Sequence, residues 1–154
     1  MDAKIFQQFV AGIQIESVLL DALHFERNAG ESVDSIRVEE VLRTLDPVVE
    51  SGERLRITAR LELAGRDNRG TTTVTDTESQ QAAAVFRLVA AVSAYYRGND
   101  LTAADPELVQ AFARTSGAMH LTGYLRQFVQ ETLARGGFPG VIMPLAAIPP
   151  VKAP

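Results

Sequence analysis

Residues that could carry out catalysis are sparse in this sequence. The histidines are His24 and His120, and the chain has no cysteine. A neutral imidazole can act as a general base or bind a metal. His24 falls on the polar side of an alternating segment, where an exposed cross-strand pair is the simpler interpretation. His120 precedes an amphipathic helix, where a solvent-facing or capping position is the simpler one. We therefore expect no catalytic residue and no histidine-built metal site.

The acidic residues and glycines give no stronger signal for chemistry. Asp67, Asp76 and Glu78 lie in or near a segment with turn composition, where carboxylates commonly make local hydrogen bonds, so they are weak evidence for a metal. Gly136 and Gly137 follow a helix and have no Lys-Ser or Lys-Thr after them, so they do not form a phosphate loop. The sequence therefore predicts a protein that is not an enzyme and has no cofactor.

Composition narrows the class of protein further. The chain has 154 residues, of which 46% are hydrophobic and 22% charged, the balance of one soluble globular domain. Its net charge is −4, and its lysines are Lys4 and Lys152, which argues against nucleic-acid binding. We find no apolar run that could cross a bilayer and no secretory signal after Met1, so we expect no membrane insertion. With no cysteine, we expect a cytoplasmic protein.

Apolar side chains stand at positions where a solvated loop or tail would be polar. One group lies in the segment 28–52 and the other after the last helix: Leu42, Leu45, Val48 and Val49, then Phe138, Val141, Ile142, Met143, Leu145 and Ile148. Contiguous apolar surface marks a binding groove or a subunit interface. The alternative is that these residues close the core of their own chain, and the sequence leaves both interpretations open.

The first part of the chain must supply a helix and a strand. Residues 1–12 have apolar side chains at helical spacing, with Asp2 as N-cap. Residues 13–26 then change to a period of two and predict a strand. The residues that share one face of this strand are Ile13, Ile15, Leu19, Leu23 and Phe25. The segment 28–52 has no steady period and contains Asp46-Pro47, so we interpret it as loop or turn.

The middle of the chain contains one clear strand and one ambiguous segment. Residues 54–63 alternate almost perfectly between apolar and polar side chains. The turn-like residues 65–70 and the β-branched run 71–77 predict an antiparallel hairpin. Residues 82–96 fit a helical stripe as well as a strand face, and their alanine content favours a helix.

The last part of the chain is helical and then apolar. Asp105 and Pro106 begin a helical region, 105–136, which Ser116-Gly117 interrupts. The main helix, 118–135, has one stripe to bury: Leu121, Leu125, Phe128, Val129, Thr132 and Leu133. Gly136 and Gly137 end it. Prolines then force residues 137–154 into an extended apolar tail. We expect an α+β domain, an antiparallel sheet of about four strands with a long helix on one face.

The end of the main helix resembles a known family. Tyr124-x-Arg126 followed by Arg135-Gly136-x-Phe138-Pro139-x-Val141-x-Met143 is similar to the signature of the export chaperone SecB. The close of the first strand, His24-Phe25-Glu26, resembles the Ser-Phe-Glu of the same family. The sequence departs from the pattern at Gly123, where a proline is usual, at Gln127, and at Pro144, one residue early. The resemblance implies one SecB-like domain over residues 1–154 and favours a strand at 82–96.

The same resemblance implies a function and an assembly. SecB-like proteins are holdases, chaperones that work without ATP, and they keep client polypeptides extended, either preproteins for export or an antitoxin. They assemble as homotetramers, dimers of dimers, with the long helices between dimers and edge strands that continue the sheet. The client-binding residues implied here are Leu42, Leu45, Val48, Val49, Tyr124, Phe138, Val141, Met143, Leu145 and Ile148.

Two further expectations concern what the protein does not do. Export members meet the motor SecA through acids on the sheet, and here Glu26 remains while Ala22 replaces an aspartate and residues 82–88 contain no acid. The chain also stops at Pro154 without the second helix and acidic tail of export members, so we expect weak or absent SecA docking. The alternative function is a small hotdog-like α+β enzyme with a pocket at a dimer interface. Glu131 is the one carboxylate after Glu107, which argues against that alternative.

Overall fold

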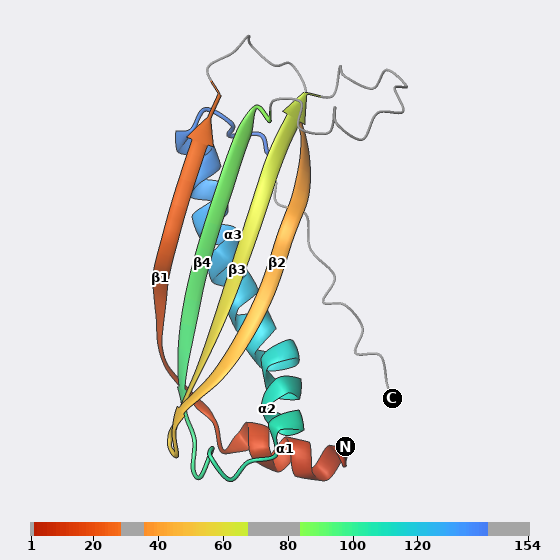
Figure 1. The fold of residues 1–154 in the computed structure, drawn as a ribbon, viewed down its shortest axis with the longest axis vertical. Coiled ribbons are helices and arrows are strands. Elements are labelled where there is room, and N and C mark those ends of the chain that lie inside the picture. Colours follow the sequence, from red (N-terminus) through yellow and green to blue (C-terminus); the bar gives the residue numbers. More distant parts are fainter. Residues whose placement is uncertain (1, 29–35, 68–83, 142–154) are drawn as a thin grey trace.

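A four-stranded antiparallel sheet forms one layer of the molecule, and a long helix crosses one of its faces (Figure 1). The computed structural model describes residues 2–28, 36–67 and 84–141. The expected α+β class, an antiparallel sheet with a long C-terminal helix, is confirmed. In chain order the elements are α1 (Ala3–Ala11), β1 (Gln14–Arg27), β2 (Ile36–Ser51), β3 (Arg54–Asp67), β4 (Phe86–Arg97), α2 (Pro106–Phe112), the π-helical turn η3 (Ala113–Gly117) and α3 (Ala118–Arg135).

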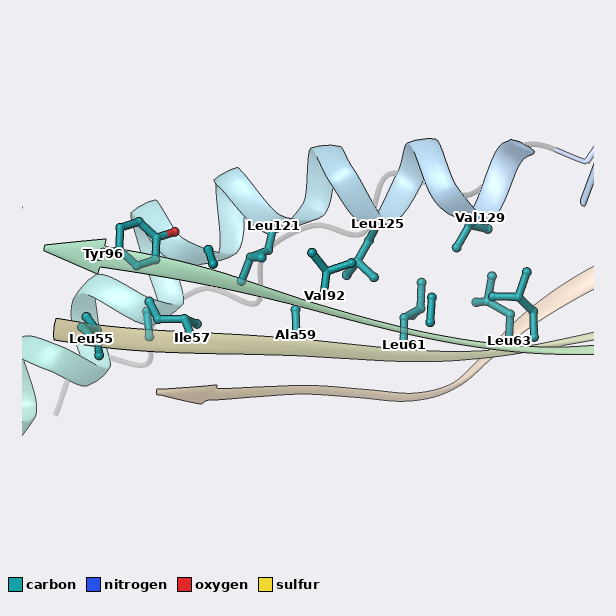
Figure 2. Packing of buried hydrophobic residues seen from close by; sticks show 14 of the residues in the cluster. Leu55, Ile57, Ala59, Leu61, Leu63, Val92, Tyr96, Leu121, Leu125 and Val129 are labelled. Carbon is teal, nitrogen blue, oxygen red and sulfur yellow. The ribbon is translucent and has the colours of Figure 1, made fainter. Parts of the chain in front are cut away.

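The strand order is β1-β4-β3-β2, so β1 and β2 are the edges of the described sheet. Alternation along β3 places its apolar side chains on the side that α3 covers, and β4 does the same (Figure 2). The α3 residues Leu121, Leu125, Val129 and Leu133 recur every fourth position and are buried against this layer. The buried core on β3 and β4 comprises Leu55, Ile57, Ala59, Leu61, Leu63, Phe86, Leu88, Ala90, Val92, Ala94 and Tyr96.

The ambiguous segment 82–96 forms a strand over its described part, β4. Five consecutive residues of β4, from Ala90 to Ala94, are all buried, because β1 and β3 flank it and α3 covers one face. Small residues fit this crowded position between two strands. Tertiary packing thus overrides the helical preference of alanine.

Two parts of the expected strand pattern were wrong. The segment interpreted as a loop at 28–52 contains the sixteen-residue strand β2, which pairs with β3. Asp46-Pro47 suggested a turn, but a proline is tolerated on an edge strand because an outward-facing position needs no N–H. Gly65 and Arg66 were expected in a turn, yet they continue β3 to Asp67. The expected strand at 71–77 lies outside the described residues.

The helical region is continuous where an interruption was expected. Ser116 and Gly117 belong to η3, which joins α2 to α3. A Cβ on Gly117 would lie 2.7 Å from Cδ1 of Ile57, so glycine lets the helix approach β3 closely. The helix start at Asp105 is confirmed, since its side chain accepts a hydrogen bond from the Glu107 N–H.

The end of α3 has the expected glycine stop. Gly136 caps the helix, and Gly137 adopts a φ of 91°, which L side chains rarely adopt. The Phe138 N–H donates to the Leu133 carbonyl at 2.8 Å, and the Gly137 N–H donates to Ala134 at 3.2 Å. This pair of bonds is the Schellman arrangement. Of the expected extended tail, residues 142–154 lie outside the described part of the chain.

Candidate functional site

The residues predicted on β2 do not share one surface. Residues that lie opposite each other in an antiparallel pair project to the same face. Leu45 and Val49 lie opposite Ala59 and Leu55, so they face α3, and both pack partly buried against the core. Val48 lies opposite Arg56 and faces the other way. The side chain of Leu42 lies outside the described residues.

The tail residue Phe138 packs into the core of its own chain. Its ring centroid lies 5.1 Å from that of Phe86 and 6.4 Å from that of Phe25. The guanidinium carbon of Arg27 stands 5.0 Å from the Phe138 ring centroid, and Arg27 Nη1 donates to the Gly136 carbonyl at 3.0 Å. These four side chains fasten the end of α3 to the end of β1, and we call them the latch. Phe138 was predicted to bind clients; its ring is buried in the core of this chain, and client binding by Phe138 stays a prediction.

The remaining tail predictions are only partly described. Val141 is half-buried against the same apolar cluster as the latch. Its N–H donates to the Phe138 carbonyl at 3.2 Å, so the chain turns immediately after the latch. Met143, Leu145 and Ile148 lie outside the described residues and stay predictions.

Tyr124 is the predicted site residue that the fold leaves accessible, with 43% of its surface exposed on α3. It lies near Tyr96, whose hydroxyl is 3.3 Å from Nδ1 of the exposed His120. Burial, and secondarily the nearby Tyr124, raises the pKa of Tyr96 to about 12. The Tyr96 phenol therefore stays protonated at neutral pH. Its hydroxyl shares a hydrogen bond with His120 Nδ1, in which the donor depends on the imidazole tautomer, and the pair holds the start of α3 against β4.

The structure reveals an apolar surface on β1 that the sequence prediction missed. Four aliphatic side chains of β1 are exposed, Ile15 at 46%, Leu19 at 51%, Leu20 at 40% and Leu23 at 42%. Three of them, Ile15, Leu20 and Leu23, share one face, and we call these three the β1 strip. Ile15, Leu20 and Leu23 lie opposite the buried residues Tyr96, Val92 and Ala90 of β4. They therefore project on the side of α3. Within the described residues β1 pairs only with β4, so its other backbone edge has no partner there.

Two irregularities in the β1 register explain why the strip was missed. Register shifts occur between Ile15 and Ser17 and between Leu20 and Ala22. Each adds one residue and reverses the alternation that follows. Leu19 was expected on the same face as Ile15, but it lies opposite Ser93 on the far face. The available signal was the run Val18-Leu19-Leu20, which puts aliphatic residues on both faces of a strand.

The second irregularity is held by a hydrogen-bond network across three strands. Asp21 is the extra residue, and its carboxylate accepts a hydrogen bond from the Ser93 hydroxyl of β4. Thr58 Oγ1 of β3 lies 2.7 Å from Ser93 Oγ. Because the one Ser93 proton is directed to Asp21, Thr58 is the donor in this second bond. Ser93 is fully buried, and these two bonds satisfy its hydroxyl. The Asp21 carboxylate is thereby bonded to a residue of its own sheet.

Ion pairs link all four strands at the opposite end of the sheet from the latch. Glu16 of β1 pairs with Arg97 of β4 at 2.8 Å and lies 3.8 Å from Arg54 of β3. Glu50 of β2 lies 3.2 Å from Arg56. The Arg54 guanidinium also stands 4.5 Å from the centroid of the Tyr95 ring. Because these ion pairs connect neighbouring strands, we assign the network to the stability of the sheet.

Other kinds of site gain no support from the described part of the chain. No group of three or more His, Cys, Asp or Glu side chains there could hold a metal ion. None of the helices described is both long enough and apolar enough to cross a membrane.

Comparisons with known proteins support the fold. No family model matches the chain, and no curated protein matches it in sequence. Among solved structures, it is similar to a SecB-like chaperone of Mycobacterium tuberculosis, solved in complex with a ChAD peptide from an antitoxin. That likeness has a TM-score of 0.68 and 16% identity, over 92% of this chain and 96% of the other. The chain therefore has the SecB-like fold.

A second structure, a Streptococcus agalactiae protein of unknown function, aligns less closely. It matches with a TM-score of 0.38 and 16% identity, over 86% of this chain and 97% of that one. A similarity this low carries no argument about fold or function.

Proposed function

We propose that this protein is a holdase, a chaperone that binds extended client polypeptides without ATP. The observation that carries the proposal is the β1 strip, whose three aliphatic residues project beside α3 on an edge strand. A soluble chain that exposes such a row has a surface for another polypeptide. The SecB-like fold and the antitoxin peptide bound to the M. tuberculosis protein support the same function.

The chemistry of the strip suits clients of many sequences. An unfolded chain exposes apolar side chains and unpaired backbone groups. Ile15, Leu20 and Leu23 can receive the first by burial, and Tyr124 adds an aromatic ring with a hydroxyl for the second. None of these contacts requires a particular client residue at a particular place. Each contact is weak, so affinity would come from several of them acting at once.

The remaining predicted client residues are proposed as secondary contacts. Leu45, Val48 and Val49 lie on β2, each only partly accessible, and Leu42 belongs to the same strand. A long client that crosses the sheet end would reach them after the β1 strip. Met143, Leu145 and Ile148 remain in the proposal on their sequence alone.

We propose that the protein assembles with copies of itself, as a tetramer built from two dimers. The outer backbone edge of β1, which has no partner among the described residues, can pair with the same edge of a copy related by a two-fold axis. In such a pair the helix-side residues of both strips would lie side by side. Dimerisation would therefore double the apolar surface offered to a client.

A second contact between copies is proposed on the outer side of α3. A Cβ built on Gly123 meets nothing within 4 Å, so packing inside the chain gives no reason for glycine there. Glycine inside a helix is less stable than alanine by about 0.5–1 kcal/mol. The neighbouring side chain of Met119 is exposed. A helix of a copy that packs closely against Gly123 and Met119 would account for the glycine and for this exposed side chain.

The client class favoured here is an antitoxin or another dedicated client, with weak docking to SecA. Glu26, the acid that remains at the end of β1, lies opposite Arg87 of β4. Its carboxylate is also 3.7 Å from the His24 Nε2. The cationic Arg87 on the facing strand lowers the attraction of this carboxylate for a basic partner surface. We expect no calorimetric binding of the zinc-bearing C-terminal peptide of SecA. Micromolar binding that Glu26→Ala abolishes would contradict this part of the proposal.

Suppression of aggregation tests the function itself. We expect a substoichiometric amount of the chaperone tetramer to delay aggregation of a reduced, denatured protein without nucleotide. Leu20→Lys should remove most of this protection, because a charge would be desolvated where the client binds. Leu19→Lys is the matched control, since the neighbouring residue projects to the opposite face. Equal loss in both variants, or no protection by the wild type, would contradict the proposal.

A further inference from the structure

The N-terminal helix α1 covers one end of the core without becoming part of it. It has nine residues, and none of them is fully buried. Its contacts come from Phe6, Phe9 and Val10, which pack partly buried against the core, while Ile5 is exposed. In Figure 1 it lies beside the start of α2, away from the body of the sheet. Helices this short are marginal in water without packing, so α1 depends on these few contacts.

The surface of α2 that α1 covers is apolar. Phe9 meets the ring of Phe112 edge to face at 6.2 Å. Phe112 and Val109 of α2 are buried where α1 packs. If α1 moved away, the Phe112 ring would become accessible to any other large apolar side chain. The position that Phe9 occupies is therefore a subsite for such a side chain.

This subsite is continuous with the end of the β1 strip. The ring of Phe112 contacts that of Tyr96 at 5.1 Å, and Tyr96 lies opposite Ile15, the first residue of the strip. Only Gly12 and Ile13 separate α1 from β1, so a departing α1 stays attached beside the strip. A client that follows the strip toward its N-terminal end reaches the place where Phe9 sits.

We propose that α1 is a displaceable cover, and that an extended client replaces it by inserting a large apolar side chain against Phe112 in the position of Phe9. The proposal rests on the proposed function and names one of its subsites. In the free protein the cover hides the subsite. A client must compete with Phe9, so the apparent affinity is lowered by the small fraction of molecules that are open.

The test measures binding of reduced, carboxymethylated α-lactalbumin, which stays unfolded without denaturant, to full-length variants. Phe9→Ala loosens α1, and we expect binding on the order of tenfold tighter, since a larger fraction of molecules is open. Ile5→Ala, an exposed residue of the same helix, should leave the affinity unchanged. Val10→Ala is a milder change and should raise the client affinity by an intermediate amount. It replaces Phe9→Ala in the test if thermal melting shows that Phe9→Ala is unstable.

Hydrogen exchange adds a second readout. In the free protein we expect α1 amides to exchange at least about 100-fold faster than those of α3, and to exchange faster still with the client bound. Unchanged or weaker binding by Phe9→Ala, with α1 amides protected by the client, would overturn the cover and show that α1 holds the client itself. Absence of binding by the wild type and all variants would instead contradict the proposed function.

Discussion

The two edges of the sheet are built from different kinds of residue. Between Ser17 and Leu23, β1 carries one charged residue, Asp21, and its carboxylate is bonded to Ser93. Its aliphatic side chains Leu19, Leu20 and Leu23 are exposed. On β2, four apolar residues, Ile36, Val38, Leu45 and Val49, instead pack partly buried against the core, and Pro47 interrupts its row of N–H groups.

Charge further protects the β2 edge. Glu39 accepts from Arg66 Nε at 2.8 Å and lies 3.5 Å from Arg37. Register shifts do not distinguish the two edges, because β1 has two and β2 has two. Proline and charges are among the features by which natural sheets prevent edge-to-edge pairing. Within the described residues these two features are concentrated on β2, which favours the proposed pairing through β1.

The largest expected effect comes from charging the open edge. Leu20→Lys with Leu23→Lys should weaken both self-association and client binding by about 100-fold or more, because two ammonium groups would be desolvated in the contact. On β2, Thr44→Lys with Asp46→Lys places the same groups at exposed positions and should change neither. Light scattering and client titration measure the two effects. Comparable loss from the β2 pair would remove the distinction between the edges.

A substitution in the latch tests whether Phe138 acts in packing or in client binding. Phe138→Ala should lower the free energy of unfolding by about 3 kcal/mol, because it empties the contact between Phe25 and Phe86. Client affinity of the folded variant should stay within about twofold of the wild type, since the ring is buried. Denaturant unfolding and client titration at low temperature separate the two. A variant that stays stable but no longer binds clients would show that Phe138 belongs to the client-binding surface.

Gly123→Ala should raise the stability of the fold and weaken the tetramer. The monomer fold should gain about 0.5–1 kcal/mol, because alanine favours a helix and nothing lies near the new methyl group. If copies meet at Gly123, the tetramer should nevertheless dissociate more readily into dimers. Thermal melting of the dilute protein measures the change in fold stability, and sedimentation at several concentrations measures the dissociation of the tetramer. A tetramer strengthened in parallel with the fold would show that this helix face is not a contact.

The smallest effect is expected from Pro47→Val on the closed edge. The change restores one N–H to β2 and adds a β-branched side chain, so the variant should self-associate slightly more at high concentration. The salt-bridged charges and the register shifts remain, which should keep the effect small. Concentration-dependent light scattering measures it. Strong aggregation would mean that this one proline is the main protection of the edge.

The sequence predicts the regular parts of this fold well. The strict alternation of 54–63 identifies β3, and the fourfold spacing from Leu121 to Leu133 identifies α3 with its buried face. Both work because one regular periodicity persists over the segment. The cap at Asp105 and the glycine stop at Gly136 are local hydrogen-bonding features, so they too can be predicted without tertiary information.

The candidate site depends on features that periodicity does not contain. The bulge at Asp21 is stabilised by Ser93, seventy-two positions away, so the face on which Leu20 lies cannot be read from β1 alone. β2 was missed because Pro47 and its charges are typical of a loop, and they become compatible with a strand only at an edge. The burial of Phe138 likewise depends on Phe25 and Phe86, which the chain brings together from distant positions.

The most direct test of the account is a crosslinking map of a bound client along both edges. The chain has no cysteine, so single cysteines at Leu20, Leu23, Tyr124, Thr44 and Val48 can each carry a photoreactive benzophenone without competing thiols. With an unfolded client bound, we predict that crosslinks concentrate at Leu20, Leu23 and Tyr124. Yields at Thr44 and Val48 that equal or exceed those at β1 would contradict the assignment of client binding to the open edge.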